Sequence, residues 1–126
     1  MQRRKPVDKI KATRIVKGYF IGFEVGDYLH ALIKTSDGKD MSFFVNQSGM
    51  QYFLALHKDQ PMEFTYQVVD TYLPEPDDIE TIKRLVAAKV GGETYSKWWR
   101  QVKLRLTTRQ IQETYDPMVE AATIEQ

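Results

Sequence analysis

The chain has 126 residues, a length that suits one compact domain. Hydrophobic residues make up 42% and charged residues 28%, close to the average for soluble globular proteins, which argues against wholesale disorder. With no cysteine and only two histidines, the chain cannot form disulfides, thiolate metal sites, cysteine nucleophiles or histidine-rich metal sites.

The N-terminus is basic, but no apolar stretch follows it, so we expect no secretory signal and a soluble, cytoplasmic protein. The longest uncharged stretch, residues 41–57, contains several polar side chains. A bilayer-spanning helix needs about 20 predominantly apolar residues, so we expect no membrane partner.

The net charge of +1 conceals four blocks of alternating sign. Residues 1–20 carry +6, residues 21–80 carry −8, residues 81–110 carry +7 and residues 111–126 carry −4. The two basic blocks would suit a face that binds phosphates. Mutual neutralisation with the acidic segments inside the fold is favoured, because nucleic-acid-binding domains usually show a clear basic excess.

Residues 10–25 predict the first strand, since they are rich in β-branched and aromatic side chains. Gly18 and Gly22 interrupt this strand, and glycine inside a strand usually marks a bulge or a sharp bend. A strongly curled sheet is therefore expected, with a turn after Val25.

Residues 28–35 and 39–46 predict a β-hairpin, because apolar side chains alternate along both segments. The loop length decides whether the two apolar sets meet, since directly opposite residues share a face. A three-residue loop, 36–38, brings them together and puts Gly38 where this loop favours a left-handed residue. The resulting pairs are Ile33 with Met41, Ala31 with Phe43, Leu29 with Val45 and Lys34 with Asp40.

That register leaves a second set of side chains on the opposite face of the hairpin. Two aromatic rings and a histidine on this face indicate that another element covers it or that it is a contact surface. The set comprises Tyr28, His30, Leu32, Phe44 and Asn46.

A helix is expected from Ser48, because Gln51 three residues later completes a capping box, and it should end at residues 59–61. Clean alternation over residues 62–68 predicts another strand, with Met62, Phe64, Tyr66 and Val68 facing inward.

Residues 77–90 predict a second helix, capped by Asp77 with Glu80 and ended by Gly91-Gly92. Residues 102–107 alternate between apolar and mostly basic side chains, which favours a fifth strand, although a helix from Ser96 remains an alternative. The acidic tail, residues 111–126, is weakly periodic, so a short helix and disorder both stay open.

These elements predict a single α+β domain over residues 1–110, built on a curled antiparallel sheet of about five strands with two main helices. The strand order is that of an OB-like barrel. A helix at 77–90 before the fifth strand departs from that order, so an antiparallel sheet backed by helices is an alternative.

Few residues suggest catalysis, and no cofactor or metal is expected. The acidic residues at 77–80 are explained by helix capping. His57 lies on an apolar helical stripe and is expected to pack at the edge of the core. His30 lies on the outward hairpin face without an evident orienting partner.

We therefore expect a non-catalytic binding module that contacts a macromolecule through an aromatic and basic sheet face. The partner is a protein, a second copy of the chain or single-stranded nucleic acid, whose bases would stack on aromatic rings. The alternative is a small ligand-binding or enzymatic barrel that uses His30 with a carboxylate such as Glu24. The candidate binding residues are Tyr28, His30, Leu32 and Phe44, with Arg14, Lys17, Lys34, Lys103 and Arg105 as the basic set.

Overall fold

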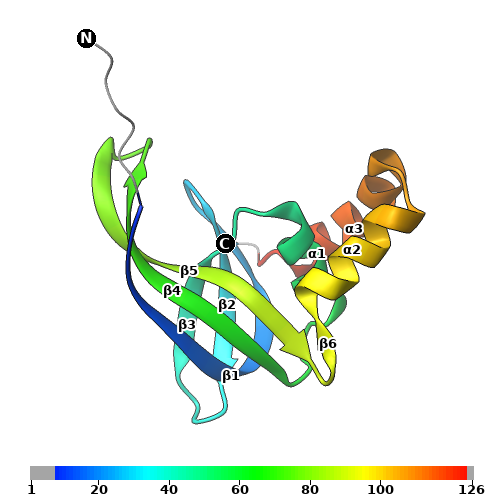
Figure 1. Ribbon diagram of the computed structural model, residues 1–126, viewed down its shortest axis with the longest axis horizontal. Helices are drawn as coiled ribbons and strands as arrows, with labels where there is room; N and C mark the ends of the chain where they lie inside the picture. Colours follow the sequence, from blue (N-terminus) through cyan, green and yellow to red (C-terminus); the bar gives the residue numbers. More distant parts are fainter. Residues whose placement is uncertain (1–7, 125–126) are drawn as a thin grey trace.

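The structure is a computed structural model that describes residues 8–124. It contains six strands and three helices in this part of the chain (Figure 1). The strands are β1 (Lys9–Val25), β2 (Leu29–Thr35), β3 (Asp40–Phe44), β4 (Met62–Leu73), β5 (Asp78–Val90) and β6 (Glu93–Thr94). The helices are α1 (Ser48–Leu56), α2 (Tyr95–Arg105) and α3 (Thr108–Ala122).

The strands form one sheet in the order β3-β2-β1-β4-β5-β6, in which neighbouring strands run antiparallel. A further, parallel pairing of Phe44 on β3 with Arg84 on β5 links the two sides of the sheet. Pairing therefore runs in a ring through five strands, while the short β6 lies outside it. The predicted α+β fold with a curled antiparallel sheet is confirmed.

The curl depends on β1, whose first half pairs with β4 and whose second half pairs with β2. A β-bulge lies between Phe20 and Gly22, as the glycine spacing predicted. At Gly18, strands β1 and β2 approach so closely that an added Cβ atom would lie 2.2 Å from the carbonyl oxygen of Lys34 on β2. Only glycine fits there.

The β2–β3 hairpin has the predicted register. Ile33 pairs with Met41, and Lys34 pairs with Asp40, with 3.1 Å between the ammonium nitrogen and the carboxylate oxygen. Gly38 in the three-residue loop has a φ of 86°, the left-handed conformation that the loop was expected to need.

Helix α1 begins at Ser48 as predicted and ends at Leu56, before the expected end at residues 59–61, and its predicted capping box is wrong. Gln47 is the N-cap residue and makes no side-chain cap hydrogen bond, while Ser48 is already inside the helix. The Gln51 amide donates instead to the carbonyl oxygen of Val45, 2.9 Å away, because the hairpin end lies within its reach. On β4, Met62, Phe64 and Tyr66 are buried as predicted.

The helix predicted at 77–90 is wrong: this segment is β5 and pairs with β4 along nearly its whole length. Asp77, the expected cap, is a turn residue with a φ of 52°, and its N–H donates to the carbonyl oxygen of Pro74. Hydrogen bonding to β4, the preceding strand of the same hairpin, outweighs the local helical spacing, since sheet pairing satisfies the same backbone groups.

The fifth strand predicted at 102–107 is also wrong, and the alternative helix from Ser96 is close to the structure. Helix α2 begins at Tyr95, and the Thr94 hydroxyl caps it by accepting from the N–H of Lys97 at 3.3 Å. Trp98 and Val102 are four residues apart, so both face α1 and α3. The packing of these side chains against α1 and α3 favours a helix over the predicted strand.

Most of the acidic C-terminal segment lies in helix α3, which begins with a capping box formed by Thr107 and Gln110. The helix runs across residue 110, where we expected the domain to end and the tail to begin. Ala122 at its end belongs to the main core. Beyond it, the N–H of Ile124 donates to the carbonyl oxygen of Phe23 at 2.8 Å, so residues 123 and 124 lie alongside β1.

The main core fills the inside of the curled sheet beneath α1, and a smaller cluster around Tyr52, Val102 and Ile111 joins the helices. The helices gather on one side, whereas the β4–β5 hairpin end projects on the other (Figure 1). In the described part of the chain, no helix combines the length and apolar character needed to cross a membrane. Five phenylalanines in the main core are fully buried: Phe20, Phe23, Phe43, Phe53 and Phe64.

Candidate binding groove

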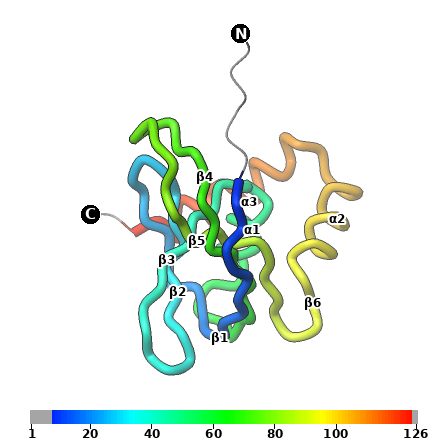
Figure 2. Tube along the Cα trace, turned by 60° about the vertical axis from the view of Figure 1, so that its left-hand side comes forward, coloured from blue at the N-terminus to red at the C-terminus, as the bar shows by residue number. Residues whose placement is uncertain are grey.

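The outward face of β2–β3 and the end of the β4–β5 hairpin enclose a groove, which we call the aromatic groove. It consists of two adjoining depressions of about 380 and 180 Å³. Figure 2 shows the hairpin end beside the turn between β1 and β2, away from the helices. Both depressions are lined by Tyr28, Phe44, Leu73 and Ile82.

Three rings from the predicted outward face meet in this groove. His30 and Phe44 are directly paired across β2–β3, with ring centroids 4.3 Å apart and an edge-on contact. The Tyr28 and Phe44 centroids are 5.5 Å apart. All three side chains are half-buried, and none of the described helices lines either depression. The rings support one another, since such aromatic pairs each add about 0.5–1.5 kcal/mol.

The opposite wall, the hairpin end, is held by two tyrosines. The Tyr28 hydroxyl accepts from the N–H of Glu75 at 3.3 Å, which ties the β1–β2 turn to the hairpin tip. The Tyr72 hydroxyl donates to the carboxylate of Asp77. This hydrogen bond is the main reason that the pKa of Tyr72 lies above its ordinary value. The groove thus has two walls from distant parts of the chain.

The groove is acidic. Asp27 and Glu80 line the larger depression, and Glu75, Asp77 and Asp78 lie at the hairpin end. Among residues 8–124, no lysine or arginine lines the larger depression.

Arg84 lines the smaller depression, but its charge is compensated. Its guanidinium donates to the Asp8 carboxylate at 2.7 Å and to the Gln67 amide oxygen at 3.1 Å. The hydrogen bond from Thr71, and secondly the hydrogen bond from Arg84, hold the pKa of Asp8 below its ordinary value. Asp8 therefore stays charged beside Arg84 near neutral pH.

The remaining aromatic-face candidate, Leu32, lies on the same face but does not line the groove. It pairs with Ser42 and Gly22, farther along the hairpin, and is half-buried. The structure therefore gathers four of the five side chains predicted on this face and leaves Leu32 outside; Asn46, which was not a candidate binding residue, lines the smaller depression.

The basic candidates do not join the aromatic rings. Arg14 and Lys17 lie on the half of β1 that pairs with β4, and the first seven residues of their basic block lie outside the described residues. Lys34 is paired with Asp40. Lys103 and Arg105 lie on α2, where the Lys103 ammonium is 5.5 Å from a Trp99 ring centroid.

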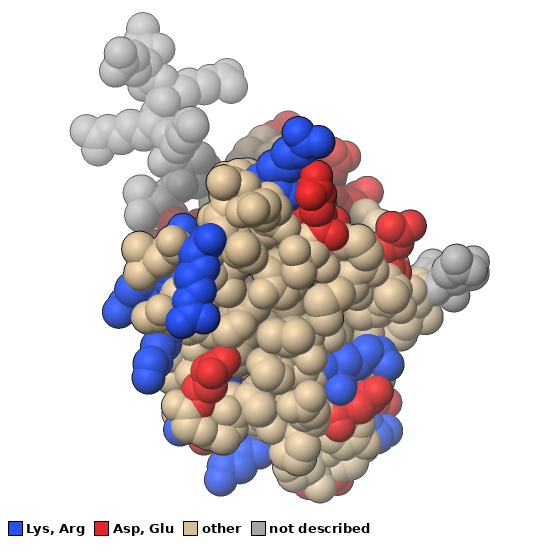
Figure 3. Space-filling model, turned by 90° about the vertical axis from the view of Figure 1, so that its right-hand side faces the viewer, with Lys and Arg blue, Asp and Glu red and all other residues tan. Residues whose placement is uncertain are grey.

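Figure 3 views the helix side, where basic side chains stand at the edge of an uncharged area, several beside acidic ones. On this face the basic residues do not merge into one patch.

Within residues 8–124, neither histidine makes a hydrogen bond to a carboxylate. Glu24 pairs directly with His30 across β1–β2, yet His30 makes no side-chain hydrogen bond within residues 8–124. His57 packs edge-on against Phe53, with its Nδ1 atom 3.3 Å from the Gln60 oxygen. The described residues contain no group of three or more His, Asp or Glu side chains that could hold a metal ion.

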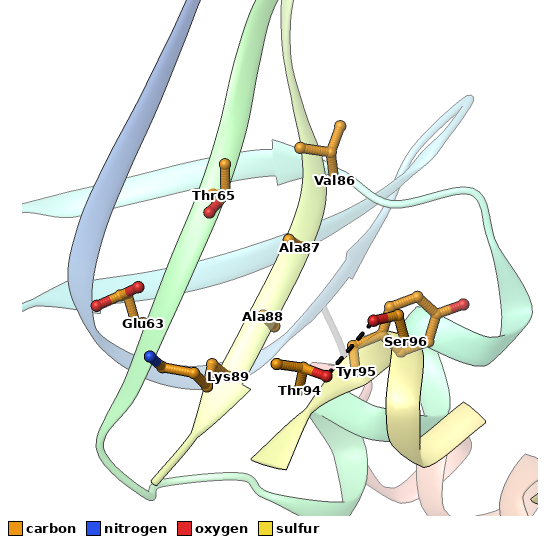
Figure 4. A pocket seen from close by; sticks show the side chains of 9 residues that line it. All are labelled: Glu63, Thr65, Val86, Ala87, Ala88, Lys89, Thr94, Tyr95 and Ser96. Carbon is orange, nitrogen blue, oxygen red and sulfur yellow. Dashed lines mark hydrogen bonds between the residues drawn. The ribbon is translucent and has the colours of Figure 1, made fainter. Parts of the chain in front are cut away.

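A second hollow, of about 330 Å³, lies between the outer side of β4–β5 and the start of α2 (Figure 4). Its polar groups have structural roles: the Thr94 hydroxyl caps α2 and lies 3.4 Å from the Ser96 hydroxyl. Glu63 and Lys89 are direct cross-strand neighbours of opposite charge. Burial raises the pKa of Tyr95, so this phenol stays neutral. This hollow brings none of the predicted site residues together.

Sequence reasoning missed the hairpin wall of the groove, because it interpreted 77–90 as a helix. The β-branched residues at 79, 81 and 82, directly after the turn-forming segment Pro74–Asp77, are a signal that could have identified a strand. No protein-family model, no curated protein and no solved structure matches the chain.

Proposed function

We propose that the chain is a binding module that takes an extended segment of a partner protein into the aromatic groove. One observation carries the proposal: Tyr28, His30 and Phe44 are only half-buried and line an open groove, although the same chain buries five phenylalanines completely. Rigid aromatic side chains that are accessible in a groove are the usual anchors of protein recognition.

The charge of the groove favours a protein over nucleic acid. Carboxylates from both walls, Asp27 and Glu80, would repel a phosphate backbone. Binding of single strands needs basic side chains that track the backbone beside the stacking rings. Four of the basic candidates lie on β1 and α2 instead, Lys34 on β2 is paired with Asp40, and Arg84 is paired with Asp8.

The proposal is tested by panning a random peptide library, displayed on phage, against the full chain. The dissociation constants of the selected peptides are then measured by calorimetry for the wild type and for Phe44→Ala. Loss of a central aromatic anchor should weaken binding about tenfold. Ile15→Ala is the matched control, since Ile15 is 65% exposed on β1 outside the groove and should leave binding unchanged.

Two outcomes would overturn the proposal. The first is that the library yields no specific peptide. The second is that the selected peptides bind Phe44→Ala as tightly as the wild type, while circular dichroism shows that the variant is folded. Steeply salt-dependent binding of a short oligothymidylate, lost on Phe44→Ala, would assign the groove to nucleic acid. A concentration-dependent dimer lost on the same substitution would assign it to a second copy.

A further inference from the structure

We infer that the aromatic groove binds an arginine side chain of the partner segment, held between Asp27 and Glu80 against the Tyr28–Phe44 ring pair. This inference rests on the proposed function and adds the chemistry of the residue that is recognised. Three features carry it: the placement of the two carboxylates, their uncompensated negative charge and the aromatic rings that line the same depression.

The two carboxylates come from opposite walls of the larger depression. Asp27 belongs to the turn between β1 and β2, and Glu80 lies on β5. Tyr28 and Phe44 line the same depression, with ring centroids 5.5 Å apart. A cation in this depression would contact aromatic rings and have a carboxylate on either wall.

The negative charge of the larger depression is uncompensated within residues 8–124, where neither Asp27 nor Glu80 forms an ion pair. Three further carboxylates, at 75, 77 and 78, add to the field from the hairpin end. Arg84, the neighbouring cation, lies 2.7 Å from Asp8 and is already neutralised. The depression is therefore complementary to a positive ligand group.

An arginine side chain suits the larger depression better than a lysine side chain does. Its planar guanidinium stacks on aromatic faces and is more weakly hydrated than an ammonium group. Its fork of N–H donors can also reach two acceptors at once, as carboxylates on opposite walls require. A lysine ammonium offers only a compact, strongly hydrated point charge.

The test uses a capped Gly/Ser peptide that carries two arginines, together with the same peptide carrying citrulline, a neutral isostere of arginine. Titration followed by ¹H–¹⁵N correlation spectra of the full chain should shift the amide signals of Tyr28, His30 and Phe44. We expect the citrulline peptide to bind at least about fivefold more weakly.

Glu80→Gln should weaken the arginine peptide about threefold or more and leave the citrulline peptide unchanged. Glu63→Gln is the matched control, because Glu63 lies on β4 outside the groove and should change neither.

Equal binding of the citrulline peptide, equal binding of a lysine peptide, or shifts confined to other surfaces would overturn the inference. The library selection separates this failure from that of the proposed function. If selected peptides bind in the groove without needing an arginine, the inference fails and the proposed function stands. If no peptide binds in the groove, both fail.

Discussion

Replacing Gly49 with alanine should destabilise the protein, although Gly49 lies within helix α1. At an unhindered helical position this substitution gains up to about 1 kcal/mol, because glycine loses more conformational freedom on folding. Here an added Cβ atom would lie 2.6 Å from Cε2 of Trp99 and 2.7 Å from the Tyr95 hydroxyl oxygen. The tertiary contact opposes the helical preference.

The expected loss of stability depends on how little the indole ring of Trp99 can move. Trp99 stacks on Trp98 with ring centroids 6.0 Å apart and contacts Tyr52 at 5.9 Å, so a shift of the ring disturbs its neighbours. Overpacking of this kind costs about 1–3 kcal/mol, which exceeds the helical gain. The free energy of unfolding should therefore fall by about 1–2 kcal/mol.

The assay is urea unfolding followed by tryptophan fluorescence, in which the midpoint should fall while the slope stays constant. The control places Gly49→Ala in a Trp99→Leu, Tyr95→Phe background, where the obstructing ring and hydroxyl are absent. In that background the substitution should be neutral or stabilising. A stabilising effect in the wild type, or an unchanged penalty in the control background, would refute the steric reasoning.

Tyr52→Phe removes the 2.6 Å hydrogen bond from the Tyr52 hydroxyl to the Asp116 carboxylate, so the free energy of unfolding should fall by about 1–2 kcal/mol in urea titrations. Burial, and secondly this hydrogen bond, raise the pKa of Tyr52 from 10.0 to about 12. Its contribution to stability should be complete below pH 10 and decline as the pH rises towards 12, a loss that Tyr52→Phe should abolish in unfolding curves at alkaline pH. Gly18→Ala should cost more than about 3 kcal/mol or prevent folding, since its Cβ would meet backbone at 2.2 Å. Gly92→Ala, with open space around the new methyl group, should leave the melting temperature nearly unchanged.

The pairing of the β2–β3 hairpin could be predicted from the sequence. The β2–β3 hairpin joins residues close along the chain, so loop length, the Lys34–Asp40 pair and the alternation of apolar residues all specify one register. The same register put Tyr28, His30 and Phe44 outward. The aromatic wall of the groove could therefore be predicted from the sequence alone.

Two elements that depend on partners outside their own segment were predicted wrongly from local pattern. Residues 77–90 carry helix-like capping residues and helix-like spacing, yet β4 supplies the hydrogen bonds that make them a strand. Residues 102–107 alternate like a strand, but Val102 packs on Tyr52 and Ile111 in a helix bundle. In both segments the local preference is weak compared with the tertiary contacts that a single stretch of sequence does not reveal.

The sequence by itself determined the composition limits, the curled sheet and the outward rings. Only the tertiary structure brought the β4–β5 hairpin across those rings, with Asp27 and Glu80 on facing walls and the basic candidates elsewhere. The physical reason is that a hairpin register depends on neighbouring residues, whereas the second wall depends on how β1 bends between β2 and β4.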